Sequence, residues 1–337
     1  MSCTSPKCFV IPPPGTGLKA RYVRNRLEWK PAGTRTPSGW TYNYLPCGGC
    51  LACRIERRQE ITILQMLEAS LHDENWFLTL TFDDSRINFP IDRTNYKWPL
   101  SSFNESMRLH YKYLKREYRY FACGEYGDKF GRPHYHLSIF GLSGHDLGLH
   151  FDSDDERRRR DTLFNGSKFR SYFGASVDSD GRPFWQSPVV VRFWPFGNHK
   201  LYRATRETFQ YVAGYVVKKL TGKANDDHDK LSAFQVQSRP SIGFPWWQLH
   251  RLDLSVIDRD KLVNDGIEID GLKWKIPRIM NRWLTYNYPL VDYEQIRARR
   301  VQDAPDYPDL KACARKAAYL RYRAASYENK NTHKEIT

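Results

Sequence analysis

Residues 132–141 read Arg-Pro-His-Tyr-His-Leu-Ser-Ile-Phe-Gly, and this stretch decides the fold. Its apolar residues, bounded by a proline and a glycine, predict a β-strand. Alternate side chains of a strand point to the same face of a sheet, so His134 and His136 project together from one side. Two imidazoles held side by side supply half of a metal site. Alone, such a pair is more often an ordinary surface or core feature.

The third metal ligand is expected from the preceding strand. A hard divalent ion such as Mg²⁺ or Mn²⁺ prefers oxygen ligands in addition to imidazole. Glu125 ends a predicted strand at 120–124, which a glycine-rich turn at 127–131 joins to the histidine strand. This antiparallel hairpin would bring the Glu125 carboxylate beside His134 and His136. Two histidines and one carboxylate leave positions open for a phosphate oxygen and water.

A second stretch, 211–219, reads Tyr-Val-Ala-Gly-Tyr-Val-Val-Lys-Lys and has helical spacing. Tyr211, Tyr215 and Lys218 therefore share one helical face. A phenol with a pKa of about 10 is a poor nucleophile at neutral pH. A metal ion that polarises a phosphate and an ammonium that favours the phenolate would both lower the barrier to attack. The alternative is a helix whose tyrosines pack on the core.

The chain is strongly basic. It has 337 residues, with 53 Lys and Arg against 38 Asp and Glu, and a formal net charge of +15. This excess favours a polyanionic partner, because neutralised phosphates release counterions. No apolar run approaches the roughly 18 residues of a membrane span. No charged start followed by an apolar stretch opens the chain, so we expect neither a membrane partner nor secretion.

Three of the seven cysteines, Cys47, Cys50 and Cys53, form a Cys-x2-Cys-x2-Cys pattern. This spacing is common in zinc sites, and Cys3 or Cys8 could supply the fourth thiolate. An iron–sulfur cluster is less favoured, because the fourth cysteine of the ferredoxin pattern is missing. The alternative to structural Zn²⁺ is a set of reduced thiols that pack in an N-terminal subdomain.

Periodicity predicts an α+β fold, with a largely antiparallel central sheet flanked by helices. The predicted helices cover 54–71, 101–119 and 205–221, and the predicted strands 76–82, 120–124, the histidine strand and 189–194. We expect an N-terminal Cys-rich segment at 1–53, a core at 54–222 with an insertion at about 142–187, and a C-terminal extension at 223–337. The extension is expected to be helical near 293–302 and 309–327.

Together these motifs resemble a known family. His-Tyr-His at 134–136 is similar to the His-hydrophobic-His motif of HUH-superfamily single-strand endonucleases. Tyr-x3-Tyr-x2-Lys at 211–218 is similar to the double-tyrosine motif of rolling-circle replication initiators, which place the tyrosines after the histidines, as here. The closer resemblance is to the initiator of the Microviridae, small single-stranded DNA phages, of the gokushovirus type. Further matching landmarks are residues 46–54, 77–82, 124–127 and 238–244.

The resemblance implies an HUH endonuclease-like core that nicks one strand of the double-stranded replicative form at its origin. Tyr211 and Tyr215 would be nucleophiles and Lys218 an auxiliary cation, with Mg²⁺ or Mn²⁺ held by Glu125, His134 and His136. The enzyme would form a 5′-phosphotyrosine link, leave a 3′-hydroxyl primer and later rejoin the displaced strand into a circle. The implied partners are single-stranded and origin duplex DNA, with host replication helicase and polymerase in the bacterial cytoplasm.

Two alternatives stay open at this point. One is a non-catalytic, zinc-containing nucleic-acid-binding protein that uses its basic and aromatic residues for recognition. The other is an HUH transposase with paired tyrosines, which differs from an initiator in biology more than in chemistry. A covalent protein–oligonucleotide adduct would separate the first alternative from the enzyme.

Overall fold

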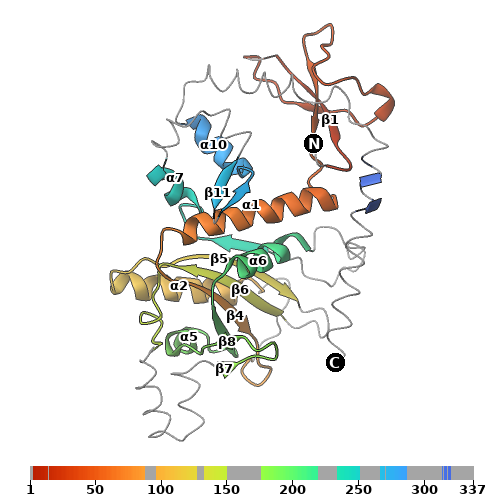
Figure 1. The fold of residues 1–337 in the computed structure, drawn as a ribbon. Helices are drawn as coiled ribbons and strands as arrows, with labels where there is room; N and C mark the ends of the chain where they lie inside the picture. Colours follow the sequence, from red (N-terminus) through yellow and green to blue (C-terminus); the bar gives the residue numbers. More distant parts are fainter. Residues whose placement is uncertain are drawn as a thin grey trace, which may run out of the picture. The chain divides into compact units, whose positions relative to one another are not determined.

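The structure is a computed structural model of the chain, which divides into two compact units, Met1–Arg57 with Arg278–Thr337, and Arg58–Pro277 (Figure 1). It describes residues 3–13, 15–87, 96–126, 133–149, 176–218, 234–250, 266–269 and 271–286, with residues 313, 315, 316, 318 and 319. None of the helices within these ranges is long and apolar enough to cross a bilayer.

The second unit is built on a five-stranded sheet of order β10-β5-β6-β4-β9. Every neighbouring pair is antiparallel, which confirms the predicted largely antiparallel sheet. The strands are β4 (Asn75–Thr81), β5 (Arg119–Tyr126), β6 (Pro133–Phe140), β9 (His199–Arg203) and β10 (Phe234–Gln237).

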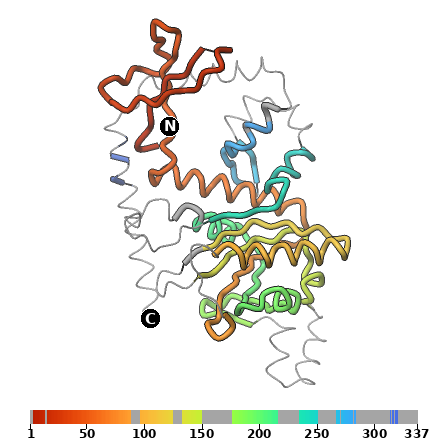
Figure 2. The backbone as a smooth tube through the Cα atoms, turned by 180° about the vertical axis from the view of Figure 1, so that it is seen from behind, coloured from red at the N-terminus to blue at the C-terminus, as the bar shows by residue number. Residues whose placement is uncertain are grey.

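Helices cover both faces of this sheet (Figure 2). Trp76 and Leu78 of β4 belong to a core shared with α2 (Trp98–Tyr113) and α5 (Pro188–Phe193). Phe77 points the other way, into a second core shared with α1 (Leu51–Ala69) and α6 (Arg206–Lys218). Because strand side chains alternate, one strand supplies both layers. The second face is the one that carries the histidines.

One predicted element is wrong. Residues 189–194, expected to be a strand from their run of valines, belong to helix α5. The Ser187 hydroxyl caps this helix by accepting a 3.1 Å hydrogen bond from the Val190 backbone N–H, and a proline at the first helical position suits a helix start. Val190 is fully buried. Packing in the core therefore overrides the β-propensity of valine.

The other core elements occur with shifted ends. Helix α1 begins and ends earlier than the predicted helix at 54–71, α2 ends well before residue 119, and α6 covers most of 205–221. Strand β9 was not predicted. Most of the proposed insertion (150–175) and the predicted helix at 293–302 lie outside the described residues, whereas the five described residues within 309–327 are helical.

The first unit contains a three-stranded antiparallel sheet of order β2-β1-β3. Its strands are β1 (Lys7–Ile11), β2 (Arg21–Tyr22) and β3 (Thr41–Leu45). One face packs Cys8 with Trp29 and Tyr44 into a small buried cluster. The remaining elements of the two units are η1 (Arg26–Glu28), β7 (Ser176–Val177), β8 (Pro183–Phe184), α7 (Phe244–His250), β11 (Ile267–Ile269), β12 (Leu272–Trp274) and α10 (Arg278–Tyr286).

Candidate active site

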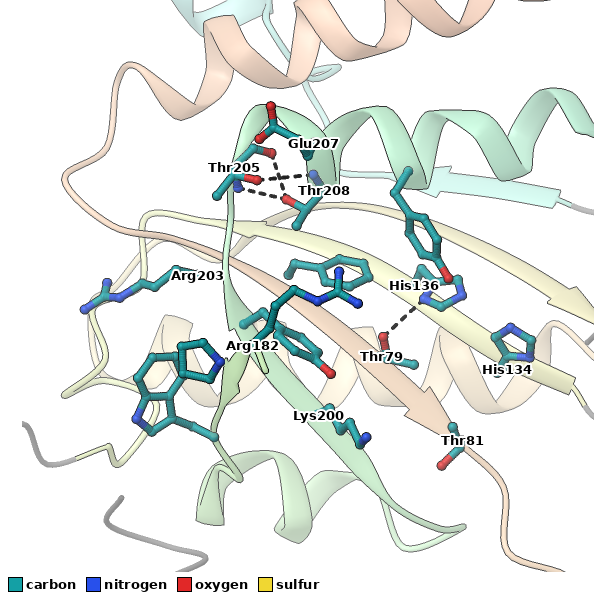
Figure 3. Close-up of a pocket in the computed structure, with 15 residues that line it drawn as sticks. Thr79, Thr81, His134, His136, Arg182, Lys200, Arg203, Thr205, Glu207 and Thr208 are labelled. Carbon is teal, nitrogen blue, oxygen red and sulfur yellow. Dashed lines mark hydrogen bonds between the residues drawn. The ribbon is translucent and has the colours of Figure 1, made fainter. Parts of the chain in front are cut away.

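His134 and His136 lie on one face of β6, as the strand pattern predicts (Figure 3). Their ring centroids are 4.9 Å apart. His136 is buried, and its Nδ1 is 3.2 Å from Thr79 Oγ1 on the neighbouring strand β4. This hydrogen bond fixes the orientation of the imidazole ring.

The predicted hairpin partner of the histidine strand is β5. The strand register places Glu125 directly opposite His134. The backbone therefore has the pairing that a two-histidine, one-carboxylate site requires. The side chains of Glu125 and Lys218 lie outside the described part of the structure.

Both tyrosines of α6 lie on the histidine face. The Tyr215 ring stacks on His136 with centroids 4.8 Å apart and planes 12° apart. The Tyr211 ring meets His136 edge-on at 5.2 Å. The Tyr215 hydroxyl donates a 2.5 Å hydrogen bond to the Tyr211 hydroxyl, and Tyr211 is 45% exposed. The fold thus brings together two histidines and two tyrosines that are far apart in the sequence.

A buried glutamine connects the tyrosine helix to the histidine strand. Gln65 of α1 donates from Nε2 to the Phe209 carbonyl of α6 at 3.3 Å. Its Oε1 accepts a 2.6 Å hydrogen bond from Ser138 Oγ of β6. Phe209 is two residues from Tyr211, and Ser138 is two residues from His136. One side chain therefore bonds both elements close to the candidate catalytic residues.

A pocket of about 970 Å³ opens beside the histidines (Figure 3). Thr79 and Thr81 of β4 line it together with Lys200, which the register places directly opposite Thr79. Lys200 therefore continues the cross-strand row that begins at His136. The pocket is also lined by Phe77, Arg182, Pro183, Trp185, Tyr202, Arg203, Thr205, Glu207, Thr208 and Tyr211.

The cations of the pocket differ in how far they are neutralised. Arg203 pairs with Glu74 at 2.6 Å, and Arg182 pairs with two aspartates in its own turn. Lys200 Nζ instead stands 4.8 Å from the centre of the Phe184 ring, a contact that leaves its charge in place. Burial raises the pKa of Tyr202 to about 12, so its hydroxyl stays protonated.

These pocket residues were missed because β9 was missed. The strand is short, and its buried positions are a histidine and Leu201, so its apolar signal is weak. Its alternation, with Lys200 and Tyr202 on the opposite face from Leu201, was the signal that could have identified it.

A candidate metal centre lies in the first unit. Four cysteine sulfurs lie within 4.8 Å of one another, those of Cys3, Cys47, Cys50 and Cys53. Two of the sulfur–sulfur distances are 3.8 Å and 4.0 Å. Tetrahedral zinc with Zn–S bonds of about 2.3 Å places its sulfurs about 3.8 Å apart, so the four thiols fit the ion. The structure selects Cys3 as the fourth residue, since Cys8 packs in the hydrophobic cluster instead.

The environment of the sulfurs also suits a cation. Burial raises the pKa of Cys3 and of Cys53. Burial acts in the same direction at Cys50, but hydrogen bonds from Thr4 and Cys53 outweigh it and lower the pKa to about 6. Four thiolates this close would repel one another without a metal ion. Backbone N–H groups also point at the sulfurs, including those of Thr4 and Cys47 at 3.4 Å and 3.3 Å.

Comparison with known proteins identifies relatives. Residues 75–220 match the family model of the replication-associated protein ORF2. Replication-associated protein VP4 of Bdellovibrio phage phiMH2K is 27% identical over 246 residues, which cover 72% of this chain and 68% of the relative. Replication-associated protein ORF2 of Spiroplasma virus 4 is 28% identical over 252 residues, 71% of this chain and 67% of the relative.

A third relative, replication-associated protein ORF4 of Chlamydia phage 1, is 27% identical over 237 residues, 69% of this chain and 52% of the relative. No solved structure matches the chain significantly. The HUH type of the central sheet therefore stays a prediction.

The histidine strand and the tyrosine helix both fall inside the matched segment. They define the class, a phage replication-associated protein of the rolling-circle initiator kind. The particular family is that of the replication-associated protein ORF2, which the segment 75–220 matches. The resemblance to Microviridae initiators, predicted from the motifs, is thereby confirmed.

Proposed function

We propose that this protein is an HUH-type endonuclease that nicks the replication origin through a phosphotyrosine intermediate. The observation that carries the proposal is the packing of Tyr211 and Tyr215 against His136, with ring centroids within 5.2 Å. A helix that merely filled the core would not need to place two hydroxyls beside a histidine pair.

In this proposal a tyrosine oxygen attacks the scissile phosphorus, and the bond from phosphorus to the 3′ oxygen breaks. The phenolic proton passes to solvent, and the departing 3′ oxygen takes up a proton. His134, His136 and Glu125 would hold Mg²⁺ or Mn²⁺, which polarises the phosphate when bound. Lys218 would favour the phenolate. The phosphoester is conserved, so a 3′-hydroxyl can later reverse the step and close a circle without ATP.

The pocket would receive the unpaired strand beside the scissile phosphate. Lys200 lies in the same cross-strand row as His136 and would contact a backbone phosphate. Trp185 and Tyr202 would offer ring faces to the bases, since stacking is available only to unpaired nucleotides. The origin duplex would therefore have to open locally before cleavage.

The cysteine cluster would bind structural Zn²⁺ in the Cys-rich segment 1–53, beside a core at 54–222 and a C-terminal extension at 223–337. We place the protein in the host bacterial cytoplasm, where it would work with the replication helicase and polymerase. A non-catalytic zinc-containing DNA binder would share the charge and the cysteines but would not form a covalent product.

Incubation with single-stranded oligonucleotides from the replicon tests the proposal. On a denaturing gel, wild-type protein should form a covalent adduct with Mg²⁺ or Mn²⁺ and none in EDTA. Replacing His134, His136 or Glu125 with Ala should abolish the adduct while largely sparing DNA binding, which rests on many basic contacts. Undiminished cleavage in EDTA would remove the metal from the mechanism.

The tyrosine variants test the nucleophiles. The double variant Tyr211→Phe/Tyr215→Phe should form no adduct, whereas Tyr113→Phe, at a position 85% exposed on α2, should react like wild type. Tyr215 has Lys218 three residues ahead, so we assign it the first cut and expect Tyr215→Phe to slow nicking more than about 100-fold. Tyr211→Phe should mainly impair rejoining. An adduct formed by the double variant at the wild-type rate would overturn the assignment.

A further inference from the structure

The N-terminal sheet of the first unit is far more basic than the rest of the chain. Residues 3–50 contain seven Lys and Arg but a single acidic residue, Glu28, against 53 and 38 overall. All seven cations are exposed, at positions 7, 19, 21, 24, 26, 30 and 35. In the described part of the chain, none of the seven forms an ion pair with a carboxylate. The positive charge of this sheet is therefore available to an anionic partner.

Four of these cations lie close together in the sequence at one edge of the sheet. Lys19, Arg21, Arg24 and Arg26 lie in or beside β2 and at the start of η1, and β2 is the edge strand. The Arg21 guanidinium stands 5.0 Å from the centre of the Trp40 ring, and Arg26 stands 5.6 Å from a tryptophan ring in the same way. Such contacts hold an arginine in place without neutralising it.

Exposed apolar side chains lie beside this basic edge. Tyr22 of β2 is 47% exposed, and its ring lies 5.4 Å from that of Phe9, its partner on β1. Leu45, 40% exposed, lies on the same face, because it pairs with Lys7, two residues before Phe9. The opposite face carries the buried cluster around Cys8. The open face thus combines aromatic rings with cations.

We propose that the basic edge, residues 19–26 with the adjoining ring of Phe9, is a second DNA-binding site whose ligand is single-stranded DNA. Cations bind backbone phosphates, and an exposed ring face stacks on a base only when the base is unpaired. The site lies in the first unit, whereas the histidine–tyrosine site lies in the second, and it does not depend on the cleavage chemistry. The cysteine cluster supports it, since Cys3 precedes β1 and Cys47 follows β3, so a bound ion would join the two ends of the sheet.

The test measures binding of a fluorescent oligothymidylate by anisotropy, in the Tyr211→Phe/Tyr215→Phe background to prevent covalent capture. Arg21→Glu/Arg24→Glu should weaken binding by at least about tenfold and reduce the slope of log affinity against log salt by about 1.4, or about 0.7 for each lost phosphate contact. The matched control, Lys112→Glu/Lys273→Glu, makes the same charge change at exposed residues of the second unit and should cost less than about twofold.

Tyr22→Ala tests stacking and should weaken binding about tenfold, whereas Tyr113→Ala should have no effect. Zinc content and circular dichroism verify the fold, and Arg24→Glu alone, outside the strands, replaces the double variant if that variant misfolds. Equal losses in the two charge variants would overturn the proposal. So would stronger binding of a duplex, or displacement of the oligonucleotide by phosphatidylglycerol vesicles. If wild type forms no covalent adduct but the charge variants differ, the proposed nuclease fails and the binding site stands.

Discussion

A single buried histidine shows how the fold sets a protonation state. His199 of β9 is buried, and its Nε2 accepts a 2.8 Å hydrogen bond from the Ser187 backbone N–H at the start of α5. Burial lowers the pKa of His199 from 6.5 to about 4. Protonation would remove the acceptor and place a charge in the core, so the folded state keeps the ring neutral.

We therefore expect the free energy of unfolding to fall as the pH drops from 6.5 toward 4. In that window the unfolded chain binds a proton at residue 199 and the folded chain does not, which favours unfolding. The full effect is at most about 3 kcal/mol. Urea unfolding at several pH values should show a smaller pH dependence for His199→Gln, which retains an acceptor but does not titrate.

The matched control for this titration is His145→Gln, at an exposed position. It should keep the wild-type dependence of stability on pH. If His199→Gln also kept that dependence, other groups would account for the acid sensitivity of the fold.

At the scale of elements, the relation between α6 and β6 decides whether the tyrosines reach the histidines. Gln65 bonds both elements, through the Phe209 carbonyl and the Ser138 hydroxyl. We expect Gln65→Leu, which removes both bonds at similar size, to slow adduct formation about 10- to 100-fold, because small misplacements of a nucleophile are costly. Affinity for the oligonucleotide should not change.

Asn104→Leu is the control for Gln65. Asn104 is also a buried amide, and it bonds the Leu100 carbonyl and the Tyr118 hydroxyl on the opposite side of the sheet. Both variants should lose thermal stability, but only Gln65→Leu should slow single-turnover adduct formation well below its melting temperature. Equal slowing in both would reduce Gln65 to an ordinary core residue.

The landmark at 238–244 has a structural explanation at this scale. The Gly243 backbone N–H donates a 2.8 Å hydrogen bond to the buried carboxylate of Glu68, which also pairs with Arg119. Arg119 in turn donates to the Pro240 carbonyl at 3.1 Å. Gly243 has a φ of +80°, which side chains rarely adopt, and a Cβ there would lie 2.9 Å from Leu64. The motif thus ties the chain after β10 to α1 and β5.

At the scale of the whole molecule, the first unit needs a cross-link that the second does not. The sheet of the first unit has a buried cluster of only three residues, Cys8, Trp29 and Tyr44, whereas two larger cores cover the faces of the other sheet. Small cores rarely stabilise a fold without a metal or a disulfide. A zinc ion in the cysteine cluster would supply that stability.

Purified protein should accordingly contain about one zinc ion per chain. Cys3→Ala and Cys50→Ser should lose the ion and lower thermal stability, because metal binding and folding are coupled. Cys8→Ala should keep the full zinc content, since Cys8 packs outside the cluster. Stable, active protein without zinc by metal analysis would contradict the assignment and leave four reduced, packed thiols.

Local patterns determined much of this protein. Alternation placed His134 and His136 on one face of a strand, and helical spacing placed Tyr211 and Tyr215 on one face of a helix. The Cys-x2-Cys-x2-Cys spacing identified three members of the cysteine cluster. These relations follow from backbone geometry over a few residues, so the sequence alone contains them.

Only the tertiary structure decided how these elements meet. It packed Tyr215 on His136, selected Cys3 over Cys8, and made a helix of a valine run that favours a strand. It also aligned Lys200 with the row of His136, through a strand that the sequence patterns did not indicate. Each outcome depends on contacts between segments that are distant in the chain. Their energies come from burial and packing in three dimensions, which short-range periodicity does not encode.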